Sequence, residues 1–355
     1  MVLQGLSEAL EIIHRKGFKV AVTVRPFVST FSKTYKSGLD FLMPNTTPNT
    51  IGAWIRQPYG EGSPALTSFD GDHSLALADV TSRDISAWVA DRLHKLVTSN
   101  ELDGIFFESV TADFLPHYYL THKPLTDPSK LSSLWVDAAR QVTTVISVTS
   151  ATQMPRLPTF VAIPWLPSSW DGLAHLLPLV LTLSVSGYPF LIPPPVGGFT
   201  NTTKPDKELY IRWLQVSTFL PVIQFATIPS SYDAEVERMA SNLTGLRQST
   251  VIPILQRYGG SSVFDGMPII RPLWMLDPFD KEGLDVADEF CVGDDLLVAP
   301  VLEVGARERE VYLPKGIWKD GIDGSLRKGG RWIHHYKTKL DQIPYFSRAA
   351  EGTRL

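Results

Sequence analysis

The chain has 355 residues, of which 44% are hydrophobic and 20% are charged. This composition is ordinary for globular proteins and excludes a disordered, collagen-like or coiled-coil chain. The 33 lysines and arginines against 37 acidic residues leave a net charge of -4, so the basic excess that binds nucleic acid or an anionic membrane is missing. We therefore expect no nucleic acid partner, and instead a small solute or another protein.

The first element predicted along the chain is a helix over residues 3–13, where apolar residues recur at helical spacing. The N-terminal residues lack the pattern of a secretory signal, and a chain that starts inside an amphipathic helix is expected to be a fragment. Cys291 is the only cysteine, which excludes an internal disulfide. The longest apolar stretch, 173–192, is interrupted by prolines and polar residues, whereas a membrane span needs ~20 apolar residues without such breaks.

After this helix, short apolar runs rich in β-branched residues alternate with amphipathic segments. Strands are predicted at 20–24, 102–107, 144–148, 160–163, 188–192 and 222–225, and helices at 85–96, 132–142, 170–183, 207–219 and 233–254. The alternation favours a parallel sheet covered by helices. Because a closed (β/α)8 barrel requires eight strands, an open doubly wound sheet stays an alternative, although no glycine-rich phosphate-binding turn follows any strand.

Two stretches depart from this alternation. The connection 26–80 is longer than ~15 residues, which is typical of a functional loop or a subdomain. After about residue 285, strand-like runs at 296–302, 310–314 and 316–318 are separated by Gly, Pro and charged residues, which indicates a small all-β domain. We predict a βα domain over residues 1–285 and a β-sandwich domain over 286–355.

Glu108 ends an otherwise apolar strand, which is where barrel enzymes place nucleophiles and general bases. A solvated acid at a strand end is the alternative. Trp165 and Trp170 lie beside prolines in a loop and are candidates to stack on sugar rings, whereas Trp88 lies within a helical pattern and is predicted to pack in the core. Glycoside hydrolysis needs two carboxyl groups about 5 to 10 Å apart, and the partner of Glu108 is not obvious.

The histidines predict no metal site, because they show no paired spacing of the kind that zinc sites use. His334 and His335 are adjacent, so on a strand they would face opposite sides. We expect neither a metal nor a cofactor. Asn201 and Asn242 each begin an Asn-x-Thr triplet that fits the acceptor pattern of N-glycosylation.

A series of motifs runs through nearly the whole chain in a fixed order. It comprises Gly17-Phe18-Lys19-Val20, Asp103-Gly104-Ile105-Phe106-Phe107-Glu108, Ser168-Ser169-Trp170-Asp171-Gly172-Leu173, Val196-Gly197-Gly198-Phe199, Arg212-Trp213-Leu214-Gln215, Arg271-Pro272-Leu273 and Gly293-Asp294-Asp295-Leu296. In this order the motifs resemble glycoside hydrolase family 31, the α-glucosidase-type retaining enzymes. The resemblance implies an α/β fold, a partial (β/α)8 TIM-type barrel lacking its first strands, followed by a small all-β sandwich domain. It also implies a carbohydrate ligand.

The segments 224–225 and 232–235 resemble one branch of that family. Members of this branch are membrane-anchored and face the lumen of the secretory pathway or the cell exterior. The resemblance implies the same location for this protein, through an anchor outside the chain.

The sequence departs from the family pattern at the catalytic positions. The nucleophilic Asp of the family falls on Glu108, which is one methylene longer. The acid/base Asp falls on or near Trp165, so that only Asp171 or Asp113 could serve as a substitute acid. General acid catalysis is typically worth ~100- to 10,000-fold, and ~1 Å of misplacement can cost ~100-fold. These departures favour a pseudoglycosidase that serves as a binding or regulatory module. The alternative is an active retaining α-glycosidase with Glu108 as its nucleophile.

The family's residues that hold sugar hydroxyls are also replaced. An Asp falls on Pro195, and an Arg and a His fall on Gln224 and Ala226. Arg25 is the one cation expected near the rim, so the predicted substrate-binding residues are Arg25, Trp165, Trp170 and Gln224. A site with fewer charges and more apolar surface suits an aromatic or hydrophobic ligand better than a bare monosaccharide, and a pocket filled by side chains is the alternative. The expected partner is a carbohydrate or an aromatic or anionic small molecule.

Overall fold

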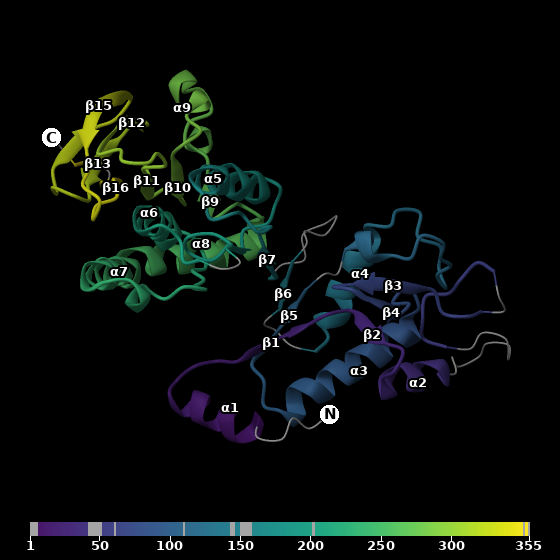
Figure 1. Cartoon of the computed structure of the whole chain (residues 1–355). Coiled ribbons are helices and arrows are strands. Elements are labelled where there is room, and N and C mark those ends of the chain that lie inside the picture. Colours follow the sequence, from purple (N-terminus) through teal and green to yellow (C-terminus); the bar gives the residue numbers. More distant parts are fainter. Residues whose placement is uncertain are drawn as a thin grey trace. The chain divides into compact units, whose positions relative to one another are not determined.

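The computed structural model describes residues 6–41, 52–59, 62–108, 111–142, 146–149, 158–200, 203–350 and 352–353. The chain divides into two compact units, residues 1–161 and 162–355 (Figure 1). The predicted domain boundary near residue 285 is a different division and stays a prediction. Among the described residues, no helix is both long and apolar enough to cross a bilayer.

The first unit is built around parallel strands in the order β1-β5-β6-β7. Val22 of β1 is in register with Ile105 of β5, and Val24 with Phe107. Ile105 and Phe107 are buried, as expected for a parallel strand covered on both faces. The strands are β1 (Ala21–Val24), β5 (Gly104–Phe107), β6 (Ile146–Val148) and β7 (Phe160–Ala162), and the helices that accompany them are α1 (Leu6–Arg15), α3 (Arg83–Ser99), η1 (Ala112–Phe114) and α4 (Lys130–Ala139). The predicted helices and strands of this unit are confirmed, except that residues 3–5 and 144–145 lie outside the described residues.

The long connection after β1 is a subdomain. It contains β2 (Phe27–Ser29), α2 (Lys33–Leu39), β3 (Leu66–Phe69) and β4 (Asp72–Leu77), and the three strands form an antiparallel sheet in the order β2-β4-β3. Trp54 is buried, with its ring stacked on Tyr35 and edge-on to Trp88. A Cβ on Gly38 would come 2.3 Å from the Trp54 ring, so only glycine fits there. Trp88 itself is partly buried, so it packs against the core residue Trp54 at the edge of the core rather than inside it as predicted.

The second unit begins with βα elements and ends in β structure. Its helices are α5 (Trp170–Val185), α6 (Lys207–Thr218), η2 (Pro229–Ser231), α7 (Ala234–Leu246), the π-helical turn η3 (Arg247–Val251), α8 (Ile252–Asp265), η4 (Leu273–Met275) and α9 (Lys281–Asp285). The strand β8 (Leu191–Ile192) is shorter than predicted, and Ile163 donates a backbone hydrogen bond to Ile192.

The strand predicted at 222–225 is wrong, because this segment has no regular structure. Its backbone runs beside the Pro193–Pro195 run, where Val196 donates a single hydrogen bond to the Gln224 carbonyl. Prolines have no N–H group, so the neighbouring chain cannot supply the donors of a strand ladder.

The end of the chain forms the predicted all-β module. Six antiparallel strands lie in the order β14-β13-β16-β11-β10-β9, and β12 pairs with β15. The strands are β9 (Ile270–Arg271), β10 (Phe290–Val292), β11 (Leu296–Val298), β12 (Glu308–Leu313), β13 (Ile317–Asp320), β14 (Leu326–Lys328), β15 (Arg331–Lys337) and β16 (Tyr345–Arg348). Cys291, Trp318 and Phe346 are fully buried in the core of this module. We call this part, from β9 onward, the β module.

A buried arginine joins α6 to the β module. The Arg212 side chain is 0% exposed and donates to Gln215 Oε1 and to the backbone carbonyls of Ala306, Lys339 and Gln342 at 3.0 to 3.4 Å. Burial lowers the pKa of the Arg212 guanidinium to about 10. Charge-assisted hydrogen bonds to several carbonyls are what a buried cation requires, so this residue fixes the packing of α6 on the module.

Candidate active site

Arg25 and Glu108 form a close ion pair at the carboxyl end of the parallel sheet. Arg25 follows β1 and Glu108 follows β5, and the parallel pairing of Val24 with Phe107 puts the next residue of each strand side by side. Arg25 Nε donates to Glu108 Oε2 at 2.6 Å, with the side chains 47% and 22% exposed. The Glu108 backbone N–H also donates to the Val24 carbonyl. The structure therefore brings two of the predicted site residues together as a pair.

An aromatic cluster supports the arginine of this pair. The Arg25 guanidinium lies 4.7 Å from the centroid of the Phe69 ring, which stacks on Phe27. Phe114 of η1 packs against both rings. The stacking fixes the orientation of the guanidinium toward Glu108. Asp113, the neighbour of Phe114, is exposed.

In the second unit, the loop 164–169 is held closely by the segment 196–199. Ser168 donates a backbone hydrogen bond to Phe199, and Phe199 donates one to Leu166. A Cβ on Gly172 would come 2.1 Å from the Pro167 carbonyl oxygen, so the loop can approach α5 only because residue 172 is glycine. Trp165 at the start of this loop is 66% exposed, and its ring lies 4.3 Å from that of Phe199.

Trp170 and Asp171 are the first residues of α5. Ser169 caps this helix by accepting a hydrogen bond from the Gly172 N–H at 3.0 Å. Asp171 is exposed in the first turn, where the helix dipole stabilises a negative charge. Its backbone carbonyl accepts a hydrogen bond from His175 Nδ1. Asp171 therefore has a place in stabilising the start of the helix.

Gln224 has a role in holding the backbone. Its Nε2 donates to the Pro193 carbonyl at 2.6 Å, and its own carbonyl accepts the Val196 N–H. Ala226 is exposed nearby in the sequence, and Pro195 accepts a hydrogen bond from Gly198. Gln224 was predicted to contact substrate. In the structure it links the segment 193–196 to the segment that follows α6.

The described residues contain no group of three His, Cys, Asp or Glu side chains arranged to hold a metal ion.

Of the two glycosylation triplets, Asn242 is exposed on α7, whereas Asn201 lies outside the described residues. Three basic residues that no sequence motif singled out, Arg83, Lys123 and Lys130, line a cavity in the first unit. Arg83 and Lys130 begin α3 and α4, which is a signal that the sequence could offer, whereas Lys123 lies in a connection without one.

Two family models match this chain. Residues 165–255 match the glycosyl hydrolases family 31 TIM-barrel domain, and residues 266–351 match the glycosyl hydrolase family 31 C-terminal domain. The chain therefore belongs to glycoside hydrolase family 31. Its fold is the partial (β/α)8 barrel followed by a β domain that the motifs predicted.

The chain is similar along most of its length to two curated proteins. It is 32% identical to the myogenesis-regulating glycosidase of Mus musculus, over 97% of this chain and 48% of that protein. It is 29% identical to the SITS-binding protein of Tetronarce californica, over 93% of this chain and 48% of that protein. The branch predicted from the segments 224–225 and 232–235 is confirmed. The chain spans about half the length of these relatives.

Solved structures share the fold at low sequence identity. A GH31 dextranase of Flavobacterium johnsoniae complexed with glucose has a TM-score of 0.85 at 21% identity, covering 97% of this chain and 45% of the dextranase. A GH31 sulfoquinovosidase from E. rectale in complex with an aza-sugar inhibitor has a TM-score of 0.81 at 20% identity, covering 98% and 53%.

Proposed function

We propose that this protein is a degenerate member of glycoside hydrolase family 31, with little or no hydrolase activity, that serves as a binding or regulatory module. The observation that supports this most strongly is the 2.6 Å ion pair between Arg25 and Glu108. The pair ties one carboxylate oxygen of Glu108 to a cation, which lowers the nucleophilicity of the carboxylate. A partly exposed pair of this kind contributes ~0.2–1 kcal/mol, and this effect adds to the cost of the misplacement caused by the longer side chain.

The proton donor is a second reason for the proposal. By the resemblance, the acid position of the family falls on or near Trp165, and an indole cannot protonate a leaving group. A general acid needs an environment that keeps its carboxyl group protonated near neutral pH, which burial usually provides. Asp171 and Asp113 are both exposed, so neither has that environment.

We further propose a location on the luminal or extracellular side of a membrane, by likeness to the predicted branch. The ligand of the degenerate site is a carbohydrate or an aromatic or anionic small molecule. Trp165 and Phe199 present an exposed aromatic surface, and flat aromatic rings suit both classes.

The rival function is that of an active retaining α-glycosidase. Glu108 favours it, because a carboxylate at the carboxyl end of a barrel strand is where such enzymes place the nucleophile. The two functions differ in whether a covalent glycosyl-enzyme forms at Glu108.

Mass spectrometry after exposure to activated cyclitol inhibitors of the α-gluco and α-galacto series separates them. We expect no stoichiometric adduct on the native chain. Glu108→Gln serves as the matched control, because it keeps the size of the side chain and cannot form the ester. An adduct at Glu108 in the native chain that is lost in this variant would establish the active enzyme and overturn the proposal.

A further inference from the structure

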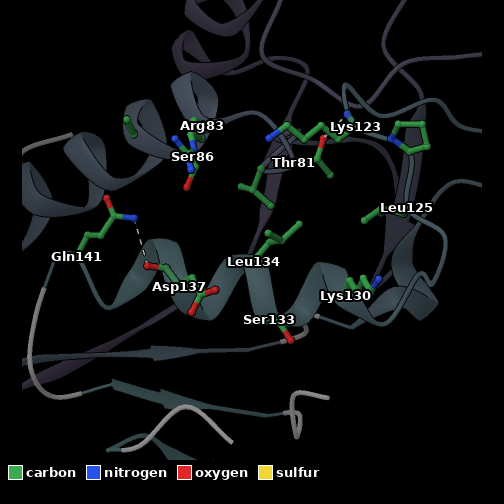
Figure 2. A pocket seen from close by; sticks show the side chains of 13 residues that line it. Thr81, Arg83, Ser86, Lys123, Leu125, Lys130, Ser133, Leu134, Asp137 and Gln141 are labelled. Carbon is green, nitrogen blue, oxygen red and sulfur yellow. Dashed lines mark hydrogen bonds between the residues drawn. The ribbon is translucent and has the colours of Figure 1, made fainter. Parts of the chain in front are cut away.

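A cavity of about 760 Å³ lies in the first unit between the start of α3, the length of α4 and the segment 123–125 (Figure 2). This volume is in the range of ligand pockets, ~300–1,000 Å³. The cavity is lined by residues of helices and connections, and neither Arg25 nor Glu108 is among them. It is therefore a separate feature from the degenerate glycosidase site.

The lining has an apolar part and a cationic part. Figure 2 shows Leu134 of α4 and Leu125 pointing into the cavity and Lys123 extending across it. Arg83 and Lys130, the first residues of α3 and α4, add two more cations.

The cations exceed the anions that could neutralise them. Within the described residues, Lys130 Nζ donates to Thr126 Oγ1 alone, at 3.3 Å. In the described part of the chain, no carboxylate pairs with Arg83, Lys123 or Lys130, and the one acid of the lining, Asp137, lies two turns of α4 beyond Lys130. The positive ends of two helix dipoles add to the same potential.

A buried carboxylate fixes the wall that carries Lys123. Asp79 is 2% exposed and accepts hydrogen bonds from the Thr81 hydroxyl, the Thr81 N–H and the His122 N–H. The Thr81 hydroxyl in turn accepts the Lys123 N–H at 3.0 Å. The segments 79–81 and 121–123 are thereby tied together, so the backbone that carries Lys123 is held in place before any ligand arrives.

We propose that this cavity binds a small organic anion, with its carboxylate, sulfonate or phosphate group between Arg83, Lys123 and Lys130 and its apolar body on Leu125 and Leu134. A neutral sugar would gain no ion-pair energy from the three cations and would bring hydroxyl groups against the leucines. An inorganic anion would leave the apolar part of the cavity empty. A molecule with an anionic group and an apolar body can contact the cations and the leucines at the same time.

The test is isothermal titration calorimetry on the full chain with 1-naphthyl phosphate, inorganic phosphate and 1-naphthol. We expect 1-naphthyl phosphate to bind and to weaken as the ionic strength is raised, because exposed charges are screened. Arg83→Gln and Lys123→Gln each should weaken it about 3- to 10-fold. Leu125→Ala should weaken the organic phosphate by a similar factor and leave inorganic phosphate unchanged.

The matched control is Lys33→Gln, which removes an exposed lysine of the same unit outside the cavity and should leave the affinity unchanged. Thermal melts of each variant will show whether the fold is retained. Three results would each overturn the proposal: 1-naphthyl phosphate fails to bind, 1-naphthol binds equally well, or Lys33→Gln weakens binding as much as Lys123→Gln. Binding to phosphatidylserine vesicles without binding of dissolved 1-naphthyl phosphate would also overturn it, because the cations would then serve a lipid surface.

Discussion

Two charged residues of the second unit, Arg212 and Asp320, are buried among hydrogen-bonding partners, whereas the cations around the cavity of the first unit lie at the surface. Arg212 is fully buried and donates four hydrogen bonds. Asp320 is also fully buried and accepts hydrogen bonds from Ile322, Arg327 and Tyr336. Arg83 and Lys123, by contrast, are exposed and have no carboxylate partner within the described residues. Because an unpaired buried charge costs several kcal/mol, the first kind of charge holds the fold together and the second is available to a ligand.

The largest effect expected from this contrast is that of removing the buried arginine. Arg212→Met removes four hydrogen bonds of a buried cation at once, three of them to the backbone carbonyls of Ala306, Lys339 and Gln342. Hydrogen bonds of charged groups are worth ~1.5–3 kcal/mol each, so we expect a loss of ~3–5 kcal/mol in the free energy of unfolding, measured in urea. Arg238→Met, at an exposed position of α7, should change it by less than ~0.5 kcal/mol. If both substitutions lower the free energy of unfolding equally, the buried arginine stabilises the fold no more than an exposed one does.

The second prediction concerns a carboxyl group buried in the β module. Glu289 is fully buried and accepts the Tyr312 N–H at 2.8 Å and an Arg309 hydrogen bond at 3.3 Å, while its Oε2 has no partner. Burial raises the pKa of Glu289 from its ordinary value of 4.5 to about 8, against the opposing effect of Arg309. The folded state therefore holds a proton between these two pH values that the unfolded state has released.

It follows that the free energy of unfolding falls as the pH rises from about 4.5 to about 8, by at most ~1.4 kcal/mol per pH unit from this group. Glu289→Gln should flatten that slope and be more stable than the native chain at pH 8. Urea unfolding at several pH values measures it, with the exposed Glu303→Gln as the control. A slope that is unchanged in Glu289→Gln would show that this carboxyl group is ionised in the folded protein.

The smallest effect is expected for the ion pair of the candidate active site. Arg25 and Glu108 are partly exposed, and pairs of this kind contribute ~0.2–1 kcal/mol. A double-mutant cycle with Arg25→Gln and Glu108→Gln should give a coupling energy in that range, which declines in high salt. A coupling energy of several kcal/mol would contradict this prediction and would mean that the pair stabilises the fold as strongly as the buried charges of the second unit do.

Elements with strong local patterns could be predicted, and contacts between distant segments could not. The apolar runs of β1 and β5 and the periodic faces of α3 and α6 were visible in the sequence. The position of Glu108 at a strand end was visible as well. Its partner Arg25 is 83 residues away, and their contact depends on the parallel register of β1 with β5, which no local pattern specifies.

The failed prediction and the missed cavity have related causes. The segment 222–225 contains residues that favour a strand. Its neighbour is a run of prolines without N–H donors, so the two segments cannot form the hydrogen bonds of a sheet, and the strand propensity of 222–225 has no effect. The hydrogen bonds of the buried Asp79 hold the segment of Lys123 beside Thr81, two residues before Arg83. In the sequence, Asp79 is a single aspartate in an apolar stretch, and nothing nearby indicates which distant segment will donate hydrogen bonds to it.

The lone cysteine of the β module gives the protein a built-in reporter of opening. Cys291 lies in the core on β10, and burial raises the pKa of its thiol, so it is protected from thiol reagents in the folded state. Because the sequence contains one cysteine, any labelling must come from this position. The rate of labelling therefore follows how often the module opens, and new cysteines can be introduced at the surface without first removing a native one.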